Sequence, residues 1–178
     1  MSDEQLWIFG YGSLIWRPGF EYVEKRPAVV TGWARRLWQA SPDHRGTPEQ
    51  PGRVVTMLRW PTQHCVGMAF AVHERDRAAV LERLDVREVA GYERVQVPVR
   101  SSLSNLPFAN ATAWVATTSN ANFIGLASVD DMVKQIRCAS GASGTNREYV
   151  IQLAKALQAL GAPEDDQIFT IASRLESS

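Results

Sequence analysis

The segment from Phe9 to Trp16 places a glycine-rich bend directly after a short apolar run. Tyr11 stands between two glycines, and Gly12 is followed by Ser13 and Leu14. Because glycine tolerates positive φ angles and close approach, consecutive N–H groups from Tyr11 to Leu14 could converge on a carboxylate or a carbonyl oxygen. A tight turn that only leaves a strand would have the same spacing. The segment therefore indicates either a simple turn or an anion-binding loop.

Glu88 is the carboxylate with the most favourable setting for acid–base chemistry. It follows a helical stripe and has apolar neighbours, among them Val86 and Val89. Partial burial would raise the pKa of this carboxyl group toward a value useful in proton transfer. A solvated helix-end carboxylate, or one paired with Arg87, is the alternative interpretation.

Arg53 and Tyr149 are further candidates for contact with a ligand. Arg53 could hold a substrate carboxylate with its planar guanidinium, or it could pair on the surface of a sheet. Tyr149 falls on the inward stripe of a predicted helix, so it is expected to pack in the core and could present its hydroxyl to a pocket.

Several common catalytic arrangements are missing from the sequence. His44, His64 and His73 are the only histidines, and they have neither metal-ligand spacing nor a cysteine cluster beside them. Ser13 is not in a Gly-x-Ser-x-Gly context, and no acid and histidine follow in hydrolase order. We therefore expect no metal and no cofactor, and a serine hydrolase is a minor alternative.

The composition limits the number of domains, the kinds of partner and the cellular compartment that we expect. A chain of 178 residues with 45% hydrophobic content is expected to form one domain spanning residues 1–178. Its 19 basic and 19 acidic residues balance, which disfavours nucleic acid and membranes as partners, while the excess of arginine over lysine hints at a small anionic ligand. Two distant cysteines and a polar, acidic N-terminus favour a soluble protein of the reducing cytoplasm.

The periodicity predicts strands first and helices later. Strands are expected at residues 6–11, 28–39, 53–59, 65–73, 92–100 and 108–117. Helices are expected from Asp76 to Leu84, after Ser128, from Thr145 to Gly161, and from Pro163 onward. This order predicts an α+β fold, with a curled mixed sheet or small barrel, flanking helices and a helical C-terminal third. The segment from Ser41 to Gly52 is expected to be a mobile loop beside a pocket.

Taken together, these segments resemble the ChaC-like family of γ-glutamylcyclotransferases along nearly the whole chain. The similar blocks, in order, are Trp7 to Pro18, Thr31 to Gln39, His44 to Thr47, Pro51 to Thr56, Leu84 to Tyr92 and Ala142 to Tyr149. One departure is Ala142, where many relatives are expected to have proline in the turn before the helix.

The resemblance implies an enzyme that cleaves glutathione without water as the nucleophile. The substrate's own α-amine attacks its γ-carbonyl, which closes the ring of 5-oxoproline and releases cysteinylglycine. The resemblance makes Glu88 the catalytic acid and base, while the loop from Tyr11 to Leu14 would donate backbone hydrogen bonds to the substrate.

Other functions remain open at this point. The enzyme could act on a different γ-glutamyl amide or amine, or the chain could be a non-catalytic module that holds an anion in the glycine loop. Nucleotide binding lacks the lysine and the strand–loop–helix order that it requires.

Overall fold

The computed structural model describes residues 5–88, 91–162 and 166–177. The strands are β1 (Trp7–Gly10), β2 (Glu24–Ser41), β3 (Gly52–Ala71), β4 (Glu93–Ser101), β5 (Pro107–Val115), β6 (Ser140–Gly141) and β7 (Gly144–Thr145). The helices are α1 (Arg77–Arg87), α2 (Val129–Cys138), α3 (Asn146–Ala159) and α4 (Asp166–Glu176), with short 3₁₀ helices η1 (Ser13–Ile15) and η2 (Glu74–Asp76).

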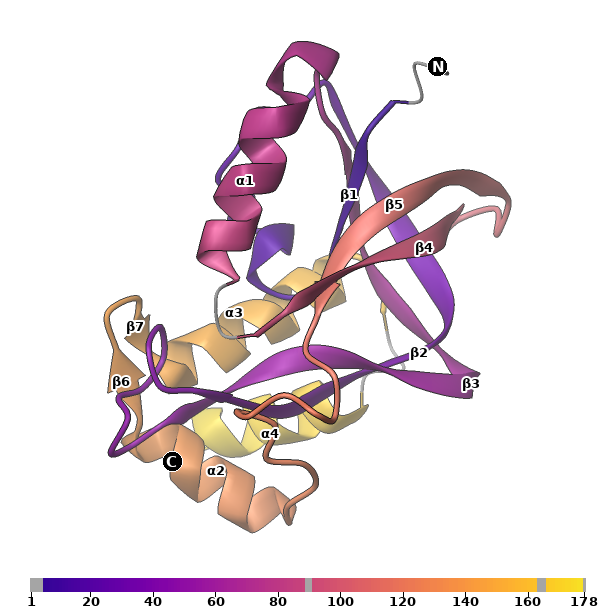
Figure 1. Cartoon of the computed structure of the whole chain (residues 1–178). Helices are drawn as coiled ribbons and strands as arrows, with labels where there is room; N and C mark the ends of the chain where they lie inside the picture. Colours follow the sequence, from indigo (N-terminus) through magenta and orange to yellow (C-terminus); the bar gives the residue numbers. More distant parts are fainter. Residues whose placement is uncertain (1–4, 89–90, 163–165, 178) are drawn as a thin grey trace.

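The first five strands form a closed barrel in the order β1-β3-β2-β4-β5. β1 closes it, because it pairs antiparallel with β3 on one side and parallel with β5 on the other. β6 and β7 form a separate small ribbon before α3. Figure 1 shows α2, α3 and α4 grouped together, with α1 standing apart from them beside β1. The predicted α+β class, with a small mixed barrel and a helical C-terminal third, is confirmed.

One long strand replaces two predicted ones. The segment expected at 53–59 and all but the last two residues of the segment expected at 65–73 are part of β3, which runs beside β2 for most of its length. The predicted break falls at an irregularity, where Thr31 pairs with His64 but Trp33 pairs with Arg59. Pro61 fits there because it lies opposite Gly32, where the ladder is interrupted and no backbone donor is needed.

The small side chains of β3 allow β1 to pack closely. A Cβ atom added at Gly67 would lie 2.3 Å from the carbonyl oxygen of Gly10 and 2.8 Å from the ring of Phe9. The face of small side chains therefore serves contact with another strand. This close packing brings the end of β1, and the glycine bend after it, against the middle of the barrel.

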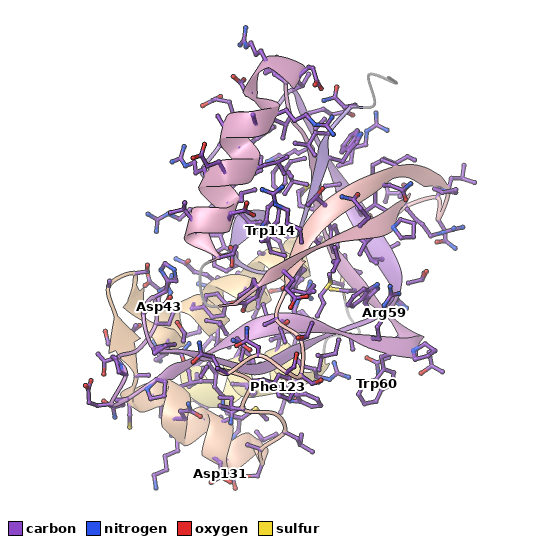
Figure 2. The ribbon with its side chains drawn as sticks, in the orientation of Figure 1. Asp43, Arg59, Trp60, Trp114, Phe123 and Asp131 are labelled. Carbon is purple, nitrogen blue, oxygen red and sulfur yellow. The ribbon has the colours of Figure 1, made fainter. Side chains whose placement is uncertain are left out.

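Two hydrophobic cores lie on opposite faces of β1. Trp7 and Phe9 contribute to a large core that also includes the apolar faces of α2, α3 and α4. Ile8 points to a smaller core that includes Val80 and Leu84 of α1. At the edge of this second core the Trp114 indole donates to Asp85 of α1 over 2.9 Å, and Figure 2 shows Trp114 beside that helix. The alternation along one strand thus fixes α1 on one side and the C-terminal helices on the other.

The predicted helix starts are confirmed by their caps. Ser128 Oγ accepts from the N–H of Asp131 over 3.1 Å, and Thr145 Oγ1 accepts from the N–H of Glu148 over 3.1 Å. α3 ends before Gly161, which has a φ of +64°. The helix start expected at Pro163 lies outside the described residues.

None of the helices in the described part of the chain is both long enough and apolar enough to cross a membrane.

Leu153 tests how much the barrel depends on α3, because this fully buried residue lies in the large core. We expect Leu153→Ala to lower the free energy of unfolding by about 2–5 kcal/mol through lost burial and a cavity. The same substitution at Leu103, which is 94% exposed in the β4–β5 turn, should change it by less than about 0.5 kcal/mol. Urea denaturation measures both, and equal effects would contradict this packing.

Candidate active site

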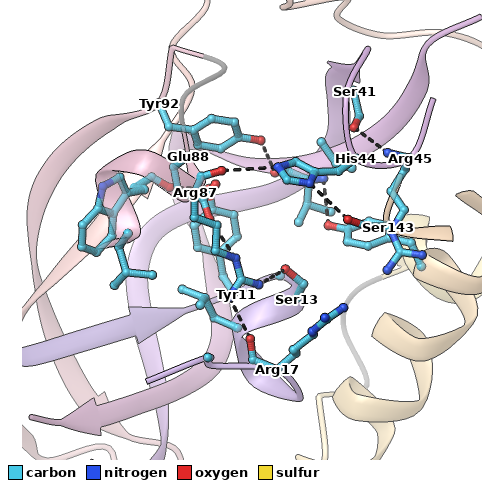
Figure 3. Close-up of a pocket in the computed structure, with 18 of the residues that line it drawn as sticks. Tyr11, Ser13, Arg17, Ser41, His44, Arg45, Arg87, Glu88, Tyr92 and Ser143 are labelled. Atoms are coloured by element: carbon cyan, nitrogen blue, oxygen red, sulfur yellow. Dashed lines mark hydrogen bonds and ion pairs between the residues drawn. The ribbon is translucent and has the colours of Figure 1, made fainter. Parts of the chain in front are cut away.

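A cavity of about 370 Å³ opens where β1 ends and α1 ends. Its walls come from the glycine bend, the last turn of α1, the loop between β2 and β3, and the start of α3. Figure 3 shows the polar side chains of these segments facing one another around the cavity. The polar lining residues discussed below are Tyr11, Ser13, Arg17, Asp43, His44, Arg45, Arg83, Arg87, Glu88, Tyr92, Ser143 and Tyr149.

The glycine bend tightens into η1 as soon as β1 ends. Gly10 has no room for a side chain, because an added Cβ would lie 2.7 Å from the Cβ of Leu14. The carbonyl of Tyr11 accepts a hydrogen bond from Nε of the buried Arg35 over 2.7 Å. Since C=O and N–H point in opposite directions across a trans peptide, this bond turns the N–H of Gly12 away from Arg35. The first N–H groups of η1 have no partner within their own helix, so they are suited to hold an oxygen.

Glu88 lies at the C-terminal end of α1, directly opposite this bend. Its backbone N–H donates to the carbonyl of Leu84 over 2.9 Å, which holds the residue at the helix end. Its side chain is only 22% exposed. Burial raises the pKa of the Glu88 carboxyl group, and the charges of Arg87 and His44 oppose that shift. A carboxyl group with a raised pKa is suited to both accept and return a proton near neutral pH.

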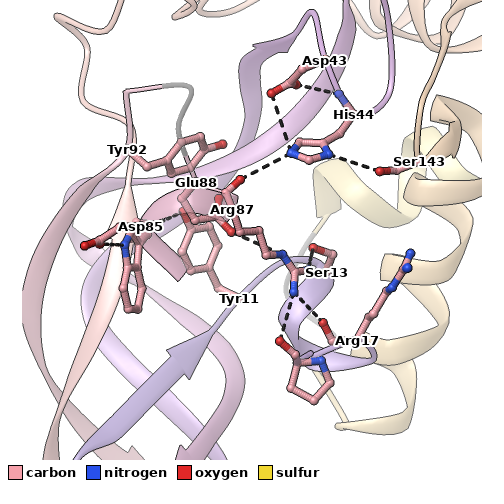
Figure 4. A network of polar contacts seen from close by, with 12 residues as sticks. Tyr11, Ser13, Arg17, Asp43, His44, Asp85, Arg87, Glu88, Tyr92 and Ser143 are labelled. Atoms are coloured by element: carbon pink, nitrogen blue, oxygen red, sulfur yellow. Dashed lines mark hydrogen bonds and ion pairs between the residues drawn. The ribbon is translucent and has the colours of Figure 1, made fainter. Parts of the chain in front are cut away.

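Arg87 joins Glu88 to the glycine bend. Its guanidinium donates to Ser13 Oγ over 2.9 Å and to the carbonyls of Arg17 and Pro18 over 2.9 and 3.0 Å. Its Nε lies 3.8 Å from Glu88 Oε1. Figure 4 shows this guanidinium between α1 and η1. The two parts of the site are therefore fixed to each other by one side chain.

Three tyrosines form the inner wall, of which Tyr11 and Tyr149 are buried and Tyr92 is half-buried. The hydroxyl of Tyr11 donates to the carbonyl of Trp114 over 2.6 Å, and that of Tyr92 donates to the carbonyl of Val55 over 3.0 Å. Tyr149 differs, because its hydroxyl accepts from the N–H of Val55 over 3.2 Å. Within the described residues no acceptor for the Tyr149 proton is found, and burial raises the pKa of Tyr149 to about 12. It is therefore a neutral donor on the cavity wall.

Gly12 lies next to this hydroxyl, since an added Cβ there would lie 3.3 Å from Tyr149 Oη. The structure thus brings six of the predicted site residues to one cavity. They are Tyr11, Gly12, Ser13, Leu14, Glu88 and Tyr149.

Arg53 is not among the residues that line the cavity. Its guanidinium donates to Gln135 Oε1 over 2.7 Å and to the carbonyls of Leu37 and Gly125 over 2.9 and 3.2 Å. Only 6% of the residue is exposed. The position was predicted from the preference of arginine for carboxylates, but these partners tie β3 to α2 instead. We therefore leave Arg53 out of the site.

The loop between β2 and β3 contributes residues to which no role was assigned from the sequence. His44 Nδ1 lies 3.2 Å from Ser143 Oγ, and its Nε2 lies 3.4 Å from the carbonyl of Arg87. Arg45 is buried and donates to Glu148 Oε2 over 3.1 Å. Both His44 and Arg45 stand in a block that carries the family resemblance, which was the available signal. The loop expected beside a pocket does line this one.

No cluster of three or more histidine, cysteine or acidic side chains suited to a metal ion is found in the described parts of the chain.

Comparison with known proteins shows the family to which the chain belongs. The model of the family described as ChaC-like protein matches residues 6–177, so the chain belongs to that family. It is 38% identical to human glutathione-specific gamma-glutamylcyclotransferase 1, over 93% of this chain and 76% of the human protein. It is 37% identical to Arabidopsis thaliana gamma-glutamylcyclotransferase 2-3, over 96% and 88% of the two chains.

Solved structures agree with this assignment. A crystal structure of the gamma-glutamyl cyclotransferase specific to glutathione from yeast superposes with a TM-score of 0.88. The two share 28% sequence identity, and the superposition covers 97% of this chain and 96% of the yeast chain.

The raised pKa of Glu88 leads to a prediction about stability. A carboxyl group that binds its proton more tightly in the native state costs stability when it is charged, at pH values above both its native and unfolded pKa. That cost disappears below the unfolded pKa of about 4.3. We expect Glu88→Gln to be more stable than the wild type at pH 7, with a difference that shrinks as the pH falls toward about 4.

Urea denaturation at several pH values between 4 and 7 measures this difference. Glu82→Gln, on the exposed face of α1, is the matched control and should show no such trend. A Glu88→Gln protein that is less stable than the wild type at pH 7 would show that the carboxylate is stabilised by its surroundings.

Proposed function

We propose that this protein is a γ-glutamylcyclotransferase that cleaves glutathione into 5-oxoproline and cysteinylglycine. The observation that carries the proposal is the placement of one largely buried carboxylate, Glu88, in the same cavity as the glycine bend. The relatives named as glutathione-specific support the choice of substrate.

The reaction needs a proton carrier and a folded substrate, and no outside nucleophile. Glu88 accepts a proton from the substrate α-ammonium, and the freed nitrogen attacks the γ-carbonyl carbon. The attacking nitrogen loses a second proton as the ring closes, and Glu88 passes protons to the leaving nitrogen as its bond to the γ-carbonyl carbon breaks. The two protons lost by the α-ammonium are the two that turn the leaving amide N–H into the ammonium of cysteinylglycine, so atoms and charge balance without water. Because both reacting groups belong to one molecule, holding them together can supply an effective concentration of about 10⁵–10⁸ M.

Charge that develops on the carbonyl oxygen needs donors. We propose that the backbone N–H groups from Gly12 to Leu14 and the Tyr149 hydroxyl provide them, with the loop also holding the substrate α-carboxylate. Donors fixed before the reaction stabilise such an oxygen more strongly than water does. Arg35 and Arg87 hold the loop from its two sides and so maintain this arrangement.

We further propose that residues 1–178 work as one domain in the cytoplasm. Cys65 is buried in the barrel and Cys138 is exposed, and these two described residues are not joined by a disulfide. Exposed thiols persist most readily in a reducing compartment.

The direct test is incubation of the purified protein with glutathione, followed by mass spectrometry. Equal amounts of 5-oxoproline and cysteinylglycine are expected. Glutathione with an acetylated α-amine should not be cleaved, because its nitrogen is no longer a nucleophile. Free glutamate would instead indicate hydrolysis, and faster release of 5-oxoproline from a γ-glutamyl dipeptide would indicate another γ-glutamyl substrate.

Removing the proton carrier should abolish most of this activity. We expect Glu88→Gln to lower kcat/KM for glutathione by about 10²–10⁴-fold, because the amide has a similar shape but cannot accept the proton. Glu82→Gln, in the same helix but exposed, should retain wild-type kinetics. Undiminished turnover by Glu88→Gln would rule out the proposed mechanism.

A further inference from the structure

The charges around the cavity are not balanced. Arg87 lies 3.8 Å from the carboxylate of Glu88, and Arg45 lies 3.1 Å from that of Glu148. Arg17 and Arg83 also line the cavity, and both are exposed. In the part of the chain that the structure describes, neither of these two side chains has a hydrogen bond or an ion pair. Asp43 also lines the cavity, and its carboxylate lies 3.7 Å from His44 Nε2. Arg17 and Arg83 therefore remain as two positive charges without an acidic partner in the described lining.

These two charges lie close enough to Arg87 to affect it. Burial lowers the pKa of Arg87, the carboxylate of Glu88 opposes that shift, and the positive charges of Arg17 and Arg83 add to it. Arg17 and Arg83 therefore each repel Arg87. An anion bound among them would relieve this repulsion, which is typical of a site for a carboxylate or a phosphate.

Arg17 has a fixed backbone and an extended side chain. Its N–H donates to the carbonyl of Ser13 over 2.8 Å, and its own carbonyl accepts from Arg87 over 2.9 Å. Figures 3 and 4 show its side chain extending along the cavity toward the side where Ser143 lies. The guanidinium is thus held near the mouth of the cavity, away from the barrel wall.

The proposed substrate, glutathione, has an anionic group that could bind to these arginines. Glutathione has two carboxylates, one on the γ-glutamyl part and one on the C-terminal glycine. The reacting end is taken up by Glu88 and the glycine bend. The glycine carboxylate lies two residues beyond the cleaved amide, about 7 Å farther along an extended chain, and so reaches outward.

We infer that Arg17, assisted by Arg83, binds the C-terminal carboxylate of the tripeptide and selects glutathione over γ-glutamyl compounds that lack this group. The inference rests on the proposed function. It assigns a specificity role to two arginines that take no part in the proton transfer. A planar guanidinium can hold both carboxylate oxygens at once, which a single ammonium cannot do.

The test compares glutathione with its C-terminal amide, in which the glycine carboxylate is neutral. The ratio of kcat/KM for glutathione to kcat/KM for the amide is measured with each variant. This ratio does not depend on the fraction of active protein, so a partly misfolded variant still gives a valid result. The wild type is expected to prefer glutathione about tenfold or more, through a lower KM.

Arg17→Gln is expected to bring the ratio close to one, and Arg83→Gln should reduce it about threefold, as expected for a weaker, more solvated charge. Arg17→Lys should give an intermediate ratio, because the charge remains but the two-pronged contact is lost. Arg75→Gln, which removes an exposed arginine of η2 outside the cavity, is the control and should leave the ratio unchanged.

The outcomes separate the two proposals. Wild-type protein that releases 5-oxoproline equally well from glutathione and the amide would overturn the role of Arg17 and leave the proposed function standing. An Arg17→Gln protein with the wild-type ratio would do the same. Wild-type protein that releases no 5-oxoproline from either compound would contradict the proposed function, and the inference would fall with it.

Discussion

The arrangement of the site depends on the Arg87 guanidinium. It holds the glycine bend at Ser13 and at two carbonyls, and it lies beside the carboxylate at the end of α1. The bend belongs to the end of β1 and the carboxylate to a helix about 75 residues later, so only tertiary contacts can keep them in register. A displacement of either part by about 1 Å would separate donor groups from the proton carrier. One planar group with several donors suits this task better than a flexible lysine.

The barrel fixes the positions of the two segments that Arg87 joins. β1 pairs with β5 at Trp7 and Ile8 and with β3 along its whole length to Gly10, so the strand that leads into the bend is held on both sides and its end is held by β3. α1 is anchored by Val80 and Leu84 in the smaller core and by the bond from Trp114 to Asp85. Both sides of the cavity therefore rest on buried elements, and the charged groups between them need little reorganisation when a ligand enters.

Much of this arrangement could be predicted from local patterns. The helix caps at Ser128 and Thr145 depend only on residues nearby in the sequence, and both cap hydrogen bonds are present as predicted. The apolar setting of Glu88 was likewise visible in its sequence neighbours. Arg53 could not be placed in this way, because its partners Leu37 and Gly125 are distant in sequence. Pro61 indicated a strand end by itself, but the irregular pairing opposite Gly32 allows β3 to continue. The strand break was wrong and the contacts of Arg53 could not be foreseen, because in both cases the partner lies in another part of the chain.

A single carboxylate is enough for the proposed reaction because the substrate brings its own nucleophile. A hydrolase must activate water or a serine and must orient a second acid or base, whereas here the protein has to fold one molecule and carry protons from its attacking nitrogen to its leaving nitrogen. This explains why the cavity has many positioning contacts and few groups that exchange protons. It also explains the net positive charge at the mouth, since a substrate with two carboxylates is oriented most easily when each end meets donors of its own. Selectivity for the tripeptide would then arise at Arg17, at a distance from the bond that breaks, and it could change without loss of the proton transfer at Glu88.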